Sequence, residues 1–155
     1  MNLSQIEANR LLAMAKVFGP SVNEIEFSLS TPFKRNYDLL EINGREKFIL
    51  DLERSSIRTA KLKFQNRARN VFVLARLDIN GTPHLNPADA HHRPGERLVG
   101  THIHVYCEGF ADKVAFLPQD LPAFANVSPA NEVDWLVAFL TFSGVHSIPQ
   151  IQTAI

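Results

Sequence analysis

The chain has little of what marks several specialised protein classes. It contains a single cysteine, Cys107, which excludes an internal disulfide framework and indicates a reducing compartment. No uninterrupted apolar run approaches the ~18–20 residues of a membrane span, and Glu7, Arg10 and Lys16 interrupt any signal-like segment near the start. We therefore expect a cytoplasmic protein that does not associate with membranes.

The sequence also lacks the short motifs of several common enzyme families. A glycine-rich phosphate loop, a nucleophile elbow, a Cys-x-x-Cys pair and a His-Glu-x-x-His helix are all missing. We therefore expect no cofactor.

The composition is that of an ordinary globular protein. The 155 residues are 45% hydrophobic and 21% charged, which argues against collagen-like, disordered and coiled-coil chains. This length suits one domain, and no repeat, low-complexity segment or linker divides the sequence. We expect a single domain over residues 1–155.

The net charge is zero, from 16 basic and 16 acidic residues, but the charges are unevenly distributed. Residues 54–76 contain no acid and carry seven cations, Arg54, Arg58, Lys61, Lys63, Arg67, Arg69 and Arg76. Such a stretch forms either a positive patch that attracts phosphates or a solvated strand face with counter-charges nearby, for which Glu41, Asp51 and Glu53 are candidates. The spacing alone does not decide between these interpretations.

The residue pattern predicts an α+β fold, with a helix at each end of a mainly antiparallel, curved sheet. Ser4 and Glu7 form a capping-box pattern ahead of the first helix, and Asn43-Gly44 is a strong hairpin signal. Ser128 is expected to cap a second helix over residues 129–142. The alternating patterns predict strands over 38–42, 47–53, 59–65, 71–79, 101–106 and 113–117.

The strand at 101–106 carries the most informative pattern. Because side chains alternate along a strand, His102, His104 and Tyr106 are expected to point to one face. Three hydrogen-bonding rings in a row suit a cleft or an open surface better than a core. The pattern therefore favours a functional site on this face.

Other polar side chains are expected near this strand. Arg76 and Asp78 share a face of the preceding strand and become neighbours of the histidines if the two strands pair. A long loop over 82–99 follows, in which flanking prolines restrict the backbone around His84 and Asn86. A loop residue held in this way is a good functional candidate.

These side chains can cleave RNA without a metal ion. Histidine gains and loses a proton near pH 7, so His102, His104 and His84 supply a base for the 2′-hydroxyl and an acid for the leaving 5′-oxygen. Arg76 stabilises the phosphorane charge, and Tyr106 completes the expected catalytic set. The expected substrate-binding residues are Lys61, Lys63, Arg67, Arg69, Asn86 and Lys113.

The same histidines permit a second chemistry. His84, His102 and His104 can hold zinc or another divalent ion with an open coordination position. Asp78 would then orient one of the ligand histidines. A metal-dependent hydrolase is therefore an alternative interpretation of the same residues.

The polar residues of this region also carry a family resemblance. An uncharacterised prokaryotic and phage family of domain-of-unknown-function proteins resembles the chain over roughly residues 61–117, at Arg76-Leu77-Asp78, Gly81, His84, Asn86-Pro87, His102, His104, Tyr106, Glu108-Gly109 and Lys113. The strand order and basic residues are also loosely similar to those of small RelE-type toxin ribonucleases, which have curved antiparallel sheets. This second resemblance implies RNA cleavage.

The preferred hypothesis is a metal-independent endoribonuclease, the toxin of a toxin–antitoxin pair, with RNA as its substrate and an antitoxin as its protein partner. One alternative is a non-catalytic, phage-encoded inhibitor that binds a host protein. The other is the histidine-coordinated, metal-dependent hydrolase.

Overall fold

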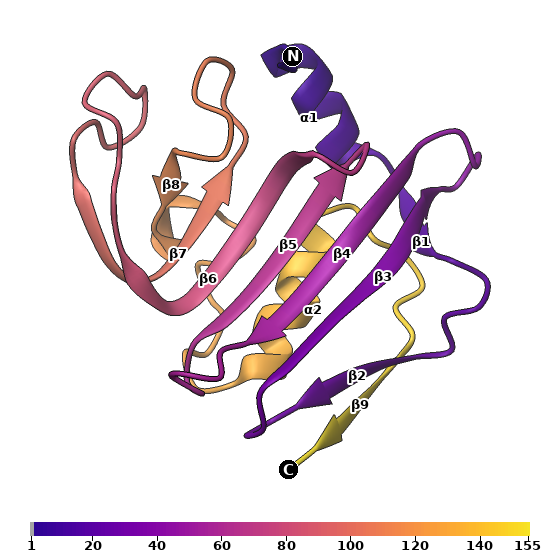
Figure 1. Ribbon diagram of the computed structural model, residues 1–155. Helices are drawn as coiled ribbons and strands as arrows, with labels where there is room; N and C mark the ends of the chain where they lie inside the picture. The colour runs from indigo at the N-terminus through magenta and orange to yellow at the C-terminus, as the bar shows by residue number, and fades with distance from the viewer. Residues whose placement is uncertain (1) are drawn as a thin grey trace.

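The computed structural model describes residues 2–155 and has an α+β fold, in which an N-terminal and a C-terminal helix accompany a mainly antiparallel seven-stranded sheet (Figure 1). The expected fold class is confirmed. No helix among these residues is long and apolar enough to cross a membrane. The elements in chain order are α1 (Gln5–Ala13), β1 (Lys16–Phe18), β2 (Glu24–Ser28), β3 (Phe33–Glu41), β4 (Lys47–Arg54), β5 (Leu62–Ala68), β6 (Phe72–Leu85), β7 (Arg97–Val105), β8 (Ala115–Phe116), the 3-10 helix η1 (Pro118–Asp120), α2 (Glu132–Phe142) and β9 (Gln150–Ala154).

The large sheet has the strand order β1-β3-β4-β5-β6-β7-β8, and β2 and β9 form a separate parallel pair. The sequence pattern did not predict β1, β2 or β9, which have only 3 to 5 residues; β2 does alternate, with Ile25 and Phe27 buried, and this signal was missed. The expected loop over 82–99 is wrong at both ends, because β6 continues to Leu85 and β7 begins at Arg97. The extra length comes from irregular pairing, which hydrophobic alternation does not reveal.

The two faces of the large sheet differ in polarity. On one face, alternate residues of β4 such as Phe48, Leu50 and Leu52 are buried. The helix α2 lies behind the central strands in Figure 1 and adds Trp135 and Phe139 to the same core. The opposite face is polar and carries the site described below.

The helix ends agree only in part with the sequence pattern. Ser4 caps α1 by accepting a hydrogen bond from the Glu7 amide at 3.1 Å, as predicted. The predicted start of α2 was wrong, because Asn131 is the N-cap and its side chain accepts from the Asp134 amide at 3.1 Å. Ser128 belongs to the preceding turn, where its carbonyl oxygen accepts from the Asn131 amide, so the helix begins later than expected.

Lys16 joins the ends of the two helices. Its side chain is fully buried, and Nζ donates to the carbonyl oxygens of Leu11, Leu12 and Met14 at 2.8, 2.9 and 3.0 Å and to that of Ser143 at 2.6 Å. Burial lowers the pKa of Lys16 to about 7, whereas the carbonyl oxygens favour its protonated form. The ammonium group therefore satisfies carbonyls that the helix ends leave without partners.

Candidate functional site

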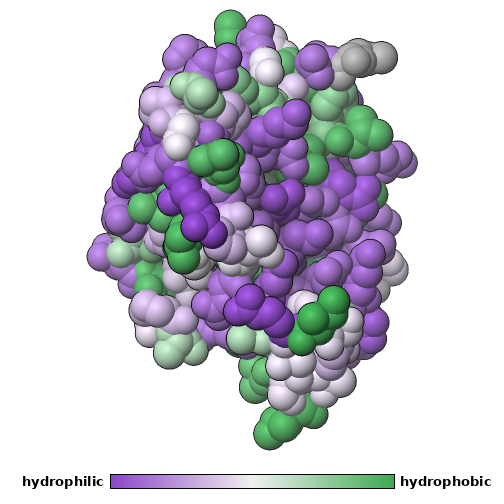
Figure 2. Space-filling model, turned by 60° about the vertical axis from the view of Figure 1, so that its left-hand side comes forward, coloured by the Kyte–Doolittle hydropathy of each residue, from purple (hydrophilic) through white to green (hydrophobic). Residues whose placement is uncertain are grey.

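A pocket of about 380 Å³ opens on the polar face of the sheet, over β5, β6 and β7. In Figure 2, hydrophilic side chains predominate across the middle of the molecule. The residues that line the pocket are Glu53, Ser55, Lys61, Leu62, Lys63, Arg76, Asp78, Thr82, Pro83, His84, His102 and His104. The pocket thus brings together seven of the twelve residues that the sequence suggested for catalysis, substrate binding or orientation.

The antiparallel register places these side chains in two rows across the sheet. In one row Lys63 on β5 lies opposite Asp78 on β6, and Asp78 lies opposite His102 on β7. In the second row Arg76 lies opposite His104. Directly opposed residues have Cβ atoms about 4.5–5.5 Å apart, so each row places its side chains next to one another.

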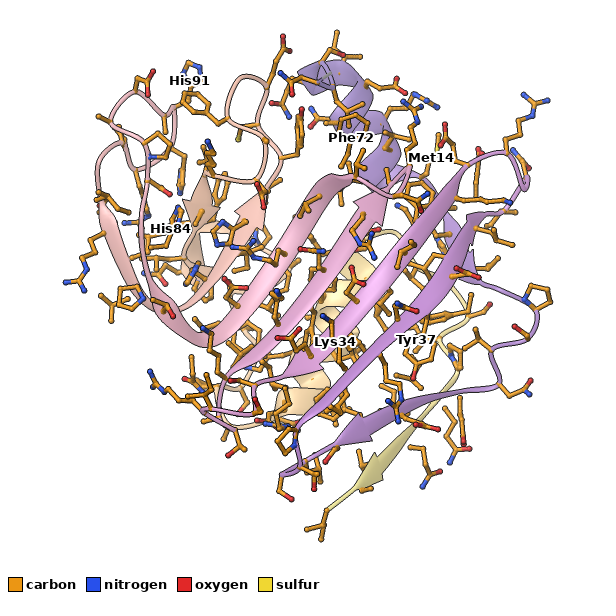
Figure 3. All side chains as sticks on the ribbon, viewed as in Figure 1. Met14, Lys34, Tyr37, Phe72, His84 and His91 are labelled. Carbon is orange, nitrogen blue, oxygen red and sulfur yellow. The ribbon has the colours of Figure 1, made fainter. Side chains whose placement is uncertain are left out.

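A bend in β6 brings His84 over the site. The β6–β7 register shifts between Asp78 and Gly81 and again between Gly81 and His84. Gly81 allows this close approach, because a Cβ atom built on it would lie only 2.9 Å from Asp78 Cβ and 3.4 Å from His102 Cε1. The imidazole of His84, labelled in Figure 3, lies with its ring centre 4.6 Å from that of His104 and 5.8 Å from that of His102.

Backbone carbonyl oxygens fix the orientation of the two strand histidines. Nδ1 of His102 lies 2.9 Å from the Gly100 carbonyl oxygen, and Nδ1 of His104 lies 2.8 Å from that of Asp112. A carbonyl oxygen only accepts hydrogen bonds, so both Nδ1 atoms carry a proton. In the neutral rings the Nε2 atoms therefore hold lone pairs. The same geometry orients ligand histidines in metal sites.

The Asp78 carboxylate meets both of these nitrogens. Its Oδ2 atom lies 3.4 Å from His102 Nε2 and 3.4 Å from His104 Nε2, and the three ligand atoms all lie within 4.8 Å of one another. A charge-assisted hydrogen bond is shorter, at about 2.7–2.9 Å. Two ligands on a tetrahedral zinc with bonds of about 2.0–2.1 Å are ~3.3–3.4 Å apart. The two distances from Asp78 Oδ2 to the histidine nitrogens thus fit ligands of a shared cation better than hydrogen bonds.

Arg76 is the nearest cation to this cluster. Its guanidinium contacts His104 Nε2 at 2.9 Å, Asp78 Oδ1 at 3.1 Å and Asp112 Oδ2 at 3.2 Å. Because the guanidinium can only donate, the contact with His104 again requires a lone pair on Nε2. The guanidinium is paired with both Asp78 and Asp112, and it keeps one of these two acidic partners if it turns away from His104.

The electrostatic environment keeps Asp78 ionised. Burial raises the pKa of its carboxyl group, but the His102 and His104 rings, which donate to it from Nε2 when they are protonated, and the charge of Arg76 outweigh burial and hold this pKa well below its usual range. Burial also lowers the pKa of His104, with Arg76 acting in the same direction. The cluster therefore contains an anionic carboxylate beside a neutral imidazole near pH 7.

His84 lies apart from the three converging ligand atoms. Its Nε2 atom lies 2.8 Å from the Lys113 carbonyl oxygen, so this nitrogen carries the proton and Nδ1 holds the lone pair. The ring is half-buried and lines the pocket. In this position His84 can accept a proton from, or return one to, a group in the pocket.

Three of the expected site residues have other contacts. The Tyr106 side chain is buried beside α1, and its hydroxyl is bonded to the backbone of Leu3; β7 ends one residue before Tyr106, so the alternation does not reach it. The Asn86 side chain is buried and bonds the backbone of Ala115, His92 and Arg93. Lys113 has an exposed side chain, and its carbonyl oxygen holds His84.

Most cations of residues 54–76 are paired with acids. Arg54 is buried against Glu132, whereas Arg67 binds Asp51 and Arg69 binds Glu7 and Glu46. Lys61 and Lys63 form no ion pair within residues 2–155, and both line the pocket. The basic stretch is therefore mostly a set of paired side chains, with its unpaired lysines at the site.

Some parts of the site have little signal in the sequence. Glu53 on β4 lies opposite Lys63 on β5 and therefore lines the pocket. Only the correct strand pairing places Glu53 there. The carbonyl oxygens of Gly100 and Asp112 orient the histidines, but every residue type has such an oxygen. Gly81 is one of the residues that carry the family resemblance, whereas its contact with Asp78 depends on the bend in β6.

Comparisons with known proteins give a family and no activity. No curated protein and no solved structure matches the chain significantly. A family model described as a family of unknown function (DUF6978) matches residues 3–145, which include both helices and every residue of the pocket. Because this match covers well over half of the chain, the protein belongs to the DUF6978 family of unknown function.

Proposed function

We propose that Asp78, His102 and His104 bind a divalent transition metal ion, with zinc as the preferred ion, and that the pocket is the centre of a metal-dependent hydrolase. The observation that carries this proposal is the 3.4 Å spacing of Asp78 Oδ2 from both Nε2 atoms, with both Nδ1 atoms bonded to carbonyl oxygens. Imidazole and carboxylate ligands suit zinc.

The ligand number also suits catalysis. Catalytic zinc sites have three protein ligands and leave one position for water or substrate, whereas structural sites have four. The side chains of Asp78, His102 and His104 supply three ligands, and the pocket gives access from one side. A bound zinc ion supplies a Lewis acid and lowers the pKa of a bound water. His84 is placed to transfer protons in the same pocket.

Metal binding can be tested on untagged protein by elemental analysis and calorimetric titration with zinc. We expect one zinc ion per chain and an affinity at least roughly 100-fold lower for His102→Ala and Asp78→Asn, because each variant removes a ligand. His146→Ala, which changes an exposed histidine, is the matched control and should bind zinc normally. Absence of stoichiometric zinc, or equal affinity in all the variants, would refute the metal site.

One contact favours a second candidate function, the metal-independent endoribonuclease. The Arg76 guanidinium lies 2.9 Å from His104 Nε2, where it already satisfies one of the lone pairs that a metal would use. In that case His104 and His84 would transfer protons and Arg76 would stabilise the phosphorane. RNA cleavage in EDTA that leaves 2′,3′-cyclic phosphate ends would support this candidate and exclude the metal-dependent one.

A further inference from the structure

The polar face continues beyond the metal pocket as a groove. Glu53 and Lys63 line both the metal pocket and an adjoining pocket of about 440 Å³, which extends over β3, β4 and β5. The other residues that line the second pocket are Lys34, Asn36, Asp51, Leu52, Gln65 and Arg67. The two pockets therefore form one continuous depression.

A single cross-strand row runs the length of this groove. Lys34, Glu53, Lys63, Asp78 and His102 lie opposite one another in turn on β3, β4, β5, β6 and β7. With strands about 4.8 Å apart, the row spans ~19 Å. That length is several times the ~3.4 Å rise per nucleotide of a stacked strand. The groove is thus longer than a mononucleotide or a free phosphate requires.

The charges along the groove favour an anion. The residues that line the two pockets include five cations, from lysine and arginine, and three carboxylates. Arg67 neutralises Asp51 through two contacts of 2.7 and 3.0 Å, and Asp78 belongs to the proposed metal site. Lys34 lies 3.9 Å from Glu53, so Lys61 and Lys63 are the lysines of the groove without acidic partners among the residues described, and a bound divalent ion would add further positive charge.

We infer that the substrate is a single-stranded nucleic acid, whose backbone follows the row from His102 to Lys34 and whose scissile phosphodiester lies in the metal pocket. This inference rests on the proposed hydrolytic function. His102 and His104 are each only 1% exposed, so a flexible strand reaches them more readily than a rigid duplex. Lys61, Lys63 and Arg76 would contact phosphate oxygens.

The reaction implied is hydrolysis of a phosphodiester. Oxygen from water forms a bond to phosphorus, one phosphorus–oxygen ester bond breaks, and the proton released from water is transferred to the departing sugar oxygen. No redox partner is required. Histidines supply the only aromatic rings among the residues that line the two pockets, so binding should depend on phosphate charge more than on base stacking and should be sensitive to salt.

Binding can be measured separately from catalysis. Fluorescence anisotropy with labelled single-stranded RNA and DNA oligonucleotides, in EDTA, reports binding by the metal-free protein even if no hydrolysis occurs. We expect Lys63→Gln to bind roughly three- to tenfold more weakly. The slope of log affinity against log salt concentration should become shallower by ~0.7, the amount expected for one phosphate contact on a single strand. Lys34→Gln, at the far end of the groove, should weaken binding of an oligonucleotide but not of a dinucleotide.

Arg45→Gln is the matched control, because Arg45 is an exposed cation in the turn between β3 and β4 and lies outside both pockets. It should bind oligonucleotides as the wild-type protein does. Absence of binding to both RNA and DNA would overturn the inference, as would equal losses in Lys63→Gln and Arg45→Gln or equally tight binding of an acidic peptide. If the protein bound oligonucleotides but did not bind zinc, only the metal site would be refuted.

Discussion

Gly81 offers a test of the metal site that leaves all three ligands in place. Gly81 does not adopt the left-handed backbone conformation, so alanine is tolerated by the backbone itself. The added Cβ atom, however, would lie 2.9 Å from Asp78 Cβ, whereas carbon atoms pack at about 3.5–4.0 Å. Asp78 must therefore move by at least ~0.6 Å in Gly81→Ala.

This displacement is large for a metal ligand. Metal–ligand distances are fixed within about 0.2 Å, so a shift of ~0.6 Å either lengthens the bond or forces the ion away from the histidines. Changes around metal ligands typically cost about 10–100-fold in affinity. We expect Gly81→Ala to lose zinc affinity in that range and to lose about 1–3 kcal/mol of unfolding free energy through overpacking.

The assay is calorimetric zinc titration of Gly81→Ala, with thermal unfolding followed by circular dichroism. Gly19→Ala is the control, because the nearest atom to its added Cβ would be Asp38 Cβ at an ordinary 3.5 Å. Cooperative unfolding of the metal-free Gly81→Ala protein would show that its fold is intact. If such a folded variant bound zinc as tightly as the wild-type protein, the assignment of Asp78 as a ligand would be wrong.

Two further predictions concern proton transfer and stability. His84→Gln should retain zinc binding but lower the turnover number for oligonucleotide hydrolysis by at least ~10²-fold, because its imidazole is the proton-transfer group in the pocket that is not a ligand; unchanged turnover would exclude that role. Lys16→Met should lower the free energy of unfolding by about 3–5 kcal/mol, because it leaves buried carbonyl oxygens without a donor. Urea denaturation measures this loss, and a change below ~1 kcal/mol would show that water or neighbouring amides replace the ammonium group.

Local sequence signals predicted much of the central sheet. The hairpin between β3 and β4, and the alternation that puts His102 and His104 on one face, depend on neighbouring residues only. Such signals act within a few residues, so a single sequence contains them. The Ser4 cap of α1 is of the same kind.

Features that depend on distant residues were missed. The contact of Gly81 with Asp78 and His102 requires the bend in β6, and the pairing of Arg54 with Glu132 joins residues 78 positions apart. Tyr106 follows the alternation in sequence, yet β7 ends at Val105 and its ring packs beside α1. Strand ends, register shifts and ion pairs are decided by the tertiary structure, which pattern analysis does not include.

The four carbonyl oxygens that accept hydrogen bonds from Lys16 Nζ have a consequence for the order of folding. Lys16 and Ser143 are 127 residues apart in sequence, so their contact closes a loop that includes the whole large sheet, from β1 to β8. Such distant contacts are entropically expensive to form early. The ammonium group therefore loses its water only when both helices have docked, and this step makes the two ends of the chain a single cooperative unit.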